Sequence, residues 1–272
     1  MFGAGLIVFR ESLEAALLIG IMAAATRGLS KRNLWIAIGI MAGLIGSFIV
    51  AGLTEYIAQL ANGSGQELFN AAILGVAVVM IGWHNIWMAS HGTEMANKAK
   101  QVGASIRDGA QELSAIAIVV ALAVLREGSE TVLFLQGIVS SDQGQAATIL
   151  LGGAFGLVAG VVMGFVIYAG LVRIPIRKLF SVTGGLLLLV AAGLAGQMAR
   201  FLIQGDWLPS LASPLWDSTN ILPINSALGS TLHILIGYES RPSGTQVLFY
   251  MVTLICIAVA ASIVRRRSVL NK

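Results

Sequence analysis

The sequence predicts an all-α polytopic membrane protein, and three observations carry this prediction. Hydrophobic residues make up 57% of the 272 positions, and charged residues only 11%. Soluble domains carry roughly a quarter charged residues, so the charge content lies far below that class. The apolar residues also occur in runs long enough for a membrane-spanning helix, which needs about 20 residues. They do not follow the short alternating pattern of outer-membrane barrels, so helices are the predicted spanning elements.

Seven transmembrane helices are predicted within a single membrane domain over residues 1–272. Their approximate ranges are 2–26, 34–60, 68–90, 113–139, 146–172, 179–204 and 245–264. Polar and glycine-containing stretches separate them. The segment 205–244 holds four of the five prolines, so it is predicted as an outer loop region rather than a spanning helix. Within it, Ile224–Tyr238 is predicted as a short helix at the membrane surface.

The basic residues indicate how the chain crosses the membrane. Thirteen Lys and Arg residues fall on the side of the connections near residues 27–32, 98–107 and 173–178 and of the C-terminal tail, against two on the opposite side. Because cytoplasmic loops are enriched in Lys and Arg, we expect the N-terminus outside and the C-terminus in the cytoplasm. The same distribution explains the pI near 9.5 without any nucleic acid partner. The short loops favour a bacterial inner membrane.

The chain contains an internal repeat. The motif Arg10–Glu14 (Arg-Glu-Ser-Leu-Glu) recurs 116 positions later as Arg126–Glu130 (Arg-Glu-Gly-Ser-Glu). Each copy opens a unit of three predicted helices, over residues 1–92 and 111–204. An odd number of helices per unit places the second copy in the opposite orientation, as in many secondary transporters with a midplane binding site. The helix 245–264 is then an addition outside two inverted three-helix repeats.

The two motifs form the predicted site. They supply the only ionisable residues other than histidine deep inside predicted spans, namely Arg10, Glu11, Glu14, Arg126, Glu127 and Glu130. Each charge near the bilayer centre costs at least ~2.5–3.5 kcal/mol, so these residues are expected to face one another or an aqueous path. An i,i+4 pair of Arg10 with Glu14 is the structural alternative, but it leaves one carboxylate per motif unexplained. The excess of acids predicts a cation site, in which the four glutamates bind the ion and the two arginines hold the carboxylates.

Weaker candidates lie outside the motifs. His84, on the predicted third helix, is an accessory candidate for relaying metal or protons, and a neutral histidine bonded to a neighbour is the alternative. Glu55, Glu67 and Asp142 lie near predicted outer helix ends and are candidates for an acidic vestibule that concentrates cations. Ordinary solvated loop charge explains these acids equally well. The single cysteine, Cys256, excludes a site built from several cysteines.

Two Arg-Glu-x-x-Glu motifs in the first and fourth of seven helices resemble the oxidase-dependent iron permeases, which include the yeast high-affinity permease and the bacterial Efe-type and Ftr-type uptake permeases. The resemblance spans essentially the whole chain and includes Gln66-Glu67-Leu68-Phe69, Trp83, Ala191-Ala192-Gly193-Leu194 and Leu232–Ser243. It implies that Glu11, Glu14, Glu127 and Glu130 bind iron during translocation. It also implies an outer-face protein that oxidises or delivers iron. Ser12 departs from the glycine usual in the family's first motif.

Several alternatives keep the fold and change the function. Carboxylates alone do not choose between iron, lead and manganese, or between Fe(II) and Fe(III). The same carboxylates could select cations in a channel instead of a carrier. An intramembrane enzyme is the remote alternative, because the sequence has neither His-Glu-x-x-His nor Gly-x-Ser-x-Gly. We expect a transporter rather than an enzyme, with iron as its substrate and no permanently bound cofactor.

Overall fold

The computed structural model describes residues 2–60, 66–141, 146–170, 176–224 and 226–270. Over these residues the chain forms eight α-helices and no β-strand, which confirms the predicted all-α architecture. In chain order the helices are α1 (Phe2–Ala25), α2 (Arg32–Leu60), α3 (Gln66–Arg107), α4 (Ser114–Ser141), α5 (Ala146–Tyr168), α6 (Ile176–Gln204), α7 (Ala227–Ile236) and α8 (Gly244–Leu270). The seven long helices correspond to the seven predicted segments, and α7 to the predicted short helix.

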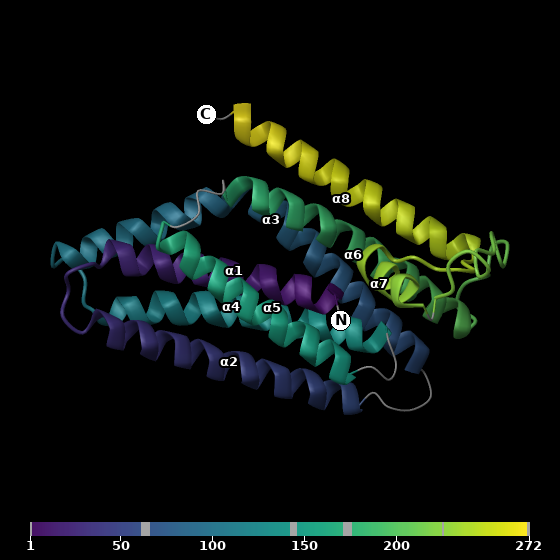
Figure 1. The fold of residues 1–272 in the computed structure, drawn as a ribbon, viewed down its shortest axis with the longest axis horizontal. Coiled ribbons are helices and arrows are strands. Elements are labelled where there is room, and N and C mark those ends of the chain that lie inside the picture. The colour runs from purple at the N-terminus through teal and green to yellow at the C-terminus, as the bar shows by residue number, and fades with distance from the viewer. Residues whose placement is uncertain (1, 61–65, 142–145, 171–175, 225, 271–272) are drawn as a thin grey trace.

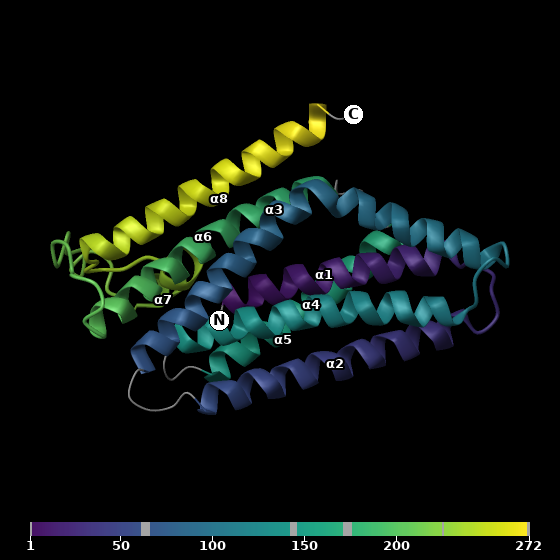
Figure 2. The same ribbon diagram turned by 180° about the vertical axis from the view of Figure 1, so that it is seen from behind.

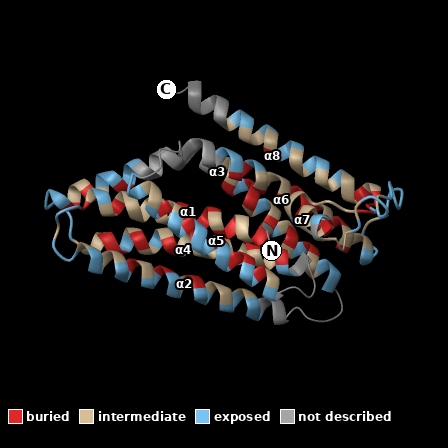
Figure 3. Ribbon diagram, viewed as in Figure 1, coloured by how far each residue is buried: buried red, intermediate tan, exposed pale blue. Residues whose placement is uncertain are grey.

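Five of the long helices contain a stretch that is long and apolar enough to cross a membrane. These stretches are Arg32–Tyr56, Gln66–Trp87, Ala147–Tyr168, Ser181–Gln204 and Gly244–Val264. α1 and α4 have similar lengths but each carries three ionisable residues of a motif. Large apolar side chains such as Phe48, Phe155 and Ile255 are exposed on the outer faces of α2, α5 and α8 (Figure 3). Helices with apolar outer faces suit a hydrocarbon solvent, so the chain is a multi-pass membrane protein.

α3 is longer than predicted. The sequence predicts an end near residue 90, where polarity rises, but the helix continues to Arg107. The prediction was wrong because hydropathy marks the end of an apolar stretch and not the end of a helix. The extension is rich in good helix formers such as alanine, lysine and glutamine. It also buries Ala99 and Ile106 against the bundle, and this packing stabilises it.

The six helices of the predicted repeats pack in exchanged pairs (Figures 1 and 2). α1 lies along α5, α2 lies along α4, and α3 lies along α6. If helices 1, 2 and 3 correspond to helices 4, 5 and 6, the α1–α5 pair maps onto the α4–α2 pair, and α3–α6 maps onto itself. This pairing is what two inverted repeats would produce, while the division at 1–92 and 111–204 stays a prediction.

Glycines allow the closest approaches between the paired helices. On α2, a Cβ added at Gly43 would lie only 2.6 Å from the Cβ of Val124 on α4. On α5, a Cβ added at Gly160 would lie 2.6 Å from the carbonyl oxygen of Phe9 on α1. Small residues bring helix backbones together where lipid, rather than water, surrounds the helices. The glycines therefore fix two tight helix pairs.

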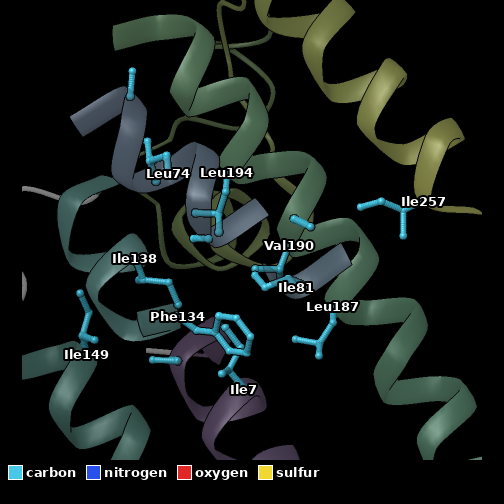
Figure 4. Close-up of a cluster of buried hydrophobic side chains, with 14 of the residues drawn as sticks. Ile7, Leu74, Ile81, Phe134, Ile138, Ile149, Leu187, Val190, Leu194 and Ile257 are labelled. Carbon is cyan, nitrogen blue, oxygen red and sulfur yellow. The ribbon is translucent and has the colours of Figure 1, made fainter. Parts of the chain in front are cut away.

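Two clusters of buried apolar side chains flank the motifs along the helices. The larger cluster includes Ile7, Leu74, Ile81, Phe134, Ile138 and Leu187 (Figure 4). The smaller cluster consists of Met22, Ile106, Ile116, Val120 and Val124, with partly buried neighbours. Along α1 and α4, the larger cluster lies about one turn from one end of each motif and the smaller cluster lies beyond the other end. Close packing thus closes the bundle above and below the motifs.

The segment between α6 and α8 covers one side of the bundle. Within it, α7 begins at the N-cap Ser226, whose side chain accepts a hydrogen bond from the Gly229 amide, and ends at Gly237 with a φ of 69°. α7 packs on α6 and α1. Its end approaches α6 so closely that a Cβ added at Gly193 would lie 2.7 Å from the Cα of Gly237. The covering segment is therefore held against α6 by glycine on both sides.

Connections gather at two opposite ends of the bundle. The α1–α2 and α3–α4 connections lie at the left end in Figure 1, and the segment 205–243 lies at the right end. Exposed basic residues such as Arg27, Lys31 and Arg107 belong to the first of these ends. The arrangement agrees with the two sets of loops expected from the sequence, and the orientation in the membrane stays a prediction.

Candidate metal site

The first motif forms a buried charge cluster on α1. The guanidinium Nη1 of Arg10 lies 3.5 Å from Glu11 Oε1, and its Nη2 lies 3.1 Å from Glu14 Oε1. Only 2% of the Arg10 side chain is exposed, and both glutamates are buried. Residues at i, i+1 and i+4 share one side of a helix, so one guanidinium reaches both carboxylates. This is the pairing that the sequence predicts.

The second motif repeats the arrangement on α4. Arg126 Nε lies 3.6 Å from Glu127 Oε1 and 3.2 Å from Glu130 Oε1. Unlike Arg10, the Arg126 side chain is 30% exposed. Its guanidinium carbon lies 4.4 Å from the centre of the Trp87 ring on α3, which is the geometry of a cation–π contact.

His84 of α3 joins the two motifs. Its Nε2 lies 3.7 Å from Glu11 Oε2 and 3.6 Å from Glu14 Oε2, and its Nδ1 contacts the Oε2 of Glu130. The next residue, Asn85, donates a 2.9 Å hydrogen bond from Nδ2 to the Gly184 carbonyl on α6 and so anchors this turn of α3. The histidine, weighed only as an accessory residue from the sequence, therefore stands at the centre of the cluster.

Four side chains offer a compact ligand set. Glu11, His84, Glu127 and Glu130 each present one ligand atom, and these atoms lie within 4.8 Å of one another. Glu14, which the sequence also predicts as a ligand, is not in this set and pairs with Arg10 instead. Among the described residues, neither Glu11 carboxylate oxygen nor Glu127 Oε2 finds a hydrogen-bond partner. Buried polar atoms are normally satisfied, so orphaned carboxylate oxygens around one point suit a bound cation. Oxygen donors with one imidazole nitrogen suit a first-row divalent ion such as Fe(II) or Mn(II).

Small residues behind the motifs account for the departure at Ser12. Ser12 on α1 faces α5, where a Cβ added at Gly160 would lie 2.8 Å from the Ser12 Cβ. At the corresponding place on α4, Gly128 faces Ser47 of α2, and a Cβ added there would lie 2.8 Å from the Ser47 Cβ. Each helix pair thus has one serine and one glycine, on opposite partners. A serine in the first motif fits because its partner helix supplies the glycine.

The other predicted candidates lie apart from this cluster. Glu55 is exposed near the end of α2, and Glu67 is exposed in the first turn of α3. Neither belongs to the ligand set around His84. Asp142 lies outside the residues that the structure describes. The acidic vestibule therefore stays a prediction.

One polar group was missed by the sequence reasoning. His233 of α7 lies with its Nδ1 2.7 Å from the Tyr238 carbonyl oxygen and its Nε2 3.1 Å from Gln197 Nε2 of α6. Because Nδ1 donates to the carbonyl, Nε2 accepts from the Gln197 amide. The bonds tie α7 to α6. His233 lies within the predicted short helix Ile224–Tyr238, but no local pattern indicates its partner on α6.

Comparisons with known proteins agree with the resemblance. The model of the iron permease FTR1 family matches residues 1–269. The ferrous iron permease EfeU of Escherichia coli O6:H1 is 31% identical over 265 residues, covering 96% of this chain and 95% of the relative. EfeU of Yersinia pestis is 32% identical over 265 residues, covering 94% and 91%. No solved structure matches the chain. On this evidence the chain belongs to the FTR1 family of iron permeases.

Proposed function

We propose that this chain is an inner-membrane permease that moves Fe(II) through the site between α1, α3 and α4. The observation that carries the proposal is the convergence of Glu11, His84, Glu127 and Glu130 on one buried point. Membership of an iron permease family supports iron as the substrate. The relatives' name, ferrous iron permease, supports the ferrous ion.

The charge of the cluster supports a divalent ion. Four carboxylates and two guanidiniums sum to a formal −2 with His84 neutral, since −4 + 2 = −2. A divalent cation neutralises that charge, whereas a trivalent cation leaves the buried cluster at +1. Uncompensated charge is costly at low dielectric, so the divalent ion is favoured. An imidazole ligand further favours Fe(II) over Mn(II), in keeping with the Irving–Williams order.

The arginines act as internal counter-ions. Arg10 and Arg126 each contact both carboxylates of their own motif. Because arginine does not deprotonate, it holds the carboxylates when the ion is absent and competes with the ion when it is present. The competition keeps the affinity low enough for release, which a carrier requires.

The repeat suggests how the site changes sides. We take residues 1–92 and 111–204 as inverted repeats, with the N-terminus outside and the C-terminus in the cytoplasm. One motif comes from each repeat, and the α1–α5 and α2–α4 pairs each join helices of both repeats, so movement of one pair against the other alternates access to the midplane site. An outer-face protein that oxidises or delivers iron is the expected partner, on the side of the segment 205–244.

Uptake into proteoliposomes of the purified protein tests the proposal. Fe(II), Fe(III), Mn(II) and Pb(II) are supplied separately to the wild type and to Glu14→Gln and Glu130→Gln. We expect saturable Fe(II) uptake that falls at least 100-fold in both variants, because each removes one buried charge of the cluster. Glu112→Gln is the matched control, since Glu112 is exposed in the α3–α4 connection and should leave uptake unchanged.

Three outcomes would contradict the proposal. Uptake that survives both substitutions would make the carboxylates structural. A preference for Pb(II) or Mn(II) would keep the site and change the ion. Flux that rises linearly with concentration would indicate a channel rather than a carrier.

His84 provides a sharper test of the ligand set. His84→Ala removes the only nitrogen donor of the set, and we expect the KM for Fe(II) to rise by roughly 10–100-fold. Selectivity for Fe(II) over Mn(II) should fall at the same time, because the remaining oxygen ligands suit Mn(II). A KM and a selectivity equal to those of the wild type would remove His84 from the site.

A further inference from the structure

A cavity opens between α3 and α4 beside the site. Its volume is about 340 Å³. α3 lines it from Val79 to Trp87, and α4 contributes Arg126 and Glu130. His84 lies in the wall, so the cavity reaches the ligand set directly.

All appreciable exposure of the site is directed into this cavity. Arg126 and Glu130 keep 30% and 16% of their side-chain surface, and both line the cavity. The other five charged or imidazole side chains of the cluster are buried, namely Arg10, Glu11, Glu14, His84 and Glu127. The cluster is therefore open on the α3–α4 side and closed around Arg10.

Apolar packing flanks the site along the bundle axis. On one side, Ile7, Ile81 and Phe134 pack together about one turn from the motif residues (Figure 4). On the other side, Val120 and Val124 pack against Met22. Neither cluster contains a polar ligand for a cation. In this conformation the α3–α4 cavity is an open approach to the carboxylates.

The α3–α4 pair has a counterpart at the other motif. Under the predicted correspondence of helices, α4 with α3 maps onto α1 with α6. There α7 packs against both helices (Figure 1). An additional helix therefore packs on the α1–α6 pair, while a cavity lies between α3 and α4.

The polarity of the open groove indicates what fills it. A guanidinium at membrane depth that keeps 30% of its surface is expected to face water or protein and not lipid tails. A space of about 340 Å³ has room for roughly ten water molecules at ~30 Å³ each. Trp87 lies 4.4 Å from the Arg126 guanidinium at the cavity wall, where Arg126 also pairs with Glu127 and Glu130.

We propose that the α3–α4 cavity is filled with water and is the path by which the cation reaches the carboxylates. Trp87 is the positioning residue that holds Arg126 at the wall of this cavity. The identity of the cation rests on the function proposed above, while the hydration of the cavity does not. The lateral opening makes Arg126 the first site residue that an approaching cation meets. Its position therefore sets how easily the cation displaces it from Glu130.

Thiol labelling tests directly whether water fills the α3–α4 cavity. Cys256 is the only cysteine, so Cys256→Ser provides a background free of thiols. Met80→Cys and Val79→Cys then place a thiol in the cavity wall, and Val158→Cys places one on the exposed apolar face of α5 at similar depth. Labelling of proteoliposomes by a charged, membrane-impermeant methanethiosulfonate should be at least tenfold faster at 80 or 79 than at 158. Addition of Fe(II) should slow it at least threefold.

Equal, slow labelling at all three positions would overturn the proposal, because lipid or a second protein chain would then cover the cavity. Fast labelling in a protein without Fe(II) uptake would refute the proposed function and leave the hydrated cavity standing. The two failures are thus distinguishable. Val79 is exposed, so its substitution guards against misfolding of Met80→Cys.

The role of Trp87 has its own readout. Trp87→Leu removes the cation–π contact, and we expect the KM for Fe(II) to rise about three- to tenfold with an unchanged maximal rate, because Arg126 then competes more strongly for the carboxylates. Trp87→Tyr keeps an aromatic face and should restore the KM. A loss of maximal rate that tyrosine does not restore would make Trp87 merely structural.

Discussion

The two copies of the motif make nearly the same contacts in different surroundings. The i,i+4 ion pairs measure 3.1 Å in α1 and 3.2 Å in α4. Yet the arginine side chain is 2% exposed in α1 and 30% exposed in α4, and the last glutamate is 3% and 16% exposed. The spacing within a motif therefore determines the local pairing, while elements outside the motif determine its access to solvent.

An element outside both repeats accompanies this difference. α7 packs on α1 and α6, the helix pair that corresponds to α4 and α3. The equivalent place beside Arg126 is the α3–α4 cavity with Trp87 in its wall. Two corresponding helices thus form a candidate site that is buried on the Arg10 side and partly exposed on the Arg126 side.

Removal of each arginine should give the largest contrast. Arg10→Met leaves Glu11 and Glu14 buried without a counter-ion and should lower the free energy of unfolding by about 3–5 kcal/mol. Arg126→Met should cost less, about 1.5–3 kcal/mol, because water in the cavity replaces part of the lost interaction. Thermal unfolding of both variants in the same detergent measures the difference. Equal losses would mean that the exposure of Arg126 has no energetic effect.

Displacement of α7 should make the surroundings of the two motifs more alike. Gly237→Ala puts a side chain at a φ of 69° and against Gly193, so it should cost about 2–3 kcal/mol through strain and overpacking. Gly109→Ala is the matched control. Gly109 has a φ of 76° with open space around it, so this variant introduces backbone strain without a steric clash. The melting temperatures of the two variants separate the contributions. A Gly109→Ala variant as unstable as Gly237→Ala would show that contact with α6 is unimportant.

An exchange of small residues tests the equivalence of the helix pairs. Gly128→Ser should destabilise the protein by about 1–3 kcal/mol, because its Cβ would lie 2.8 Å from the Ser47 Cβ. Adding Ser47→Gly should restore most of the loss, because the added Cβ clashes only with the Ser47 side chain. The double variant then has serine on the motif helix and glycine on its partner, as the α1–α5 pair does. A double-mutant cycle gives the coupling. Additive losses in the cycle would argue against the equivalence.

The smallest effect is expected at the surface of the covering segment. Arg241 Nε lies 3.2 Å from Asp217 Oδ2, and hydrogen bonds from Thr219 hold the pKa of Asp217 below its usual value. A lowered pKa contributes stability above the pKa of the unfolded chain and loses it as the pH falls. Because both side chains are exposed, Arg241→Ala should leave the melting temperature and its pH dependence unchanged. A shift of the melting temperature at neutral pH would show that this pair helps to hold the covering segment over α1.

The sequence predicted the architecture and the motif contacts well, for physical reasons. Apolar runs and repeated charges are local signals, so the helices and the pairing of Arg10 with Glu11 and Glu14 follow from spacing. The central position of His84 depends on how α3 lies against α1 and α4, which no local pattern encodes. The same holds for the extension of α3 to Arg107, which depends on packing against α1 and α4 rather than on hydropathy.

The tight glycine contacts have a mechanical consequence. Backbone atoms of α1 meet α5 at Gly160, and α4 meets α2 at Gly43 and Gly128, so neither motif helix slides freely past its partner. When α1 separates from α4, α5 therefore moves with α1 and α2 moves with α4. Glu11 belongs to the α1–α5 pair, and Glu127 and Glu130 belong to the α2–α4 pair. Separation of the two pairs therefore moves Glu11 away from Glu127 and Glu130. Under the proposed function, separation of the candidate ligands and opening of the bundle are a single motion.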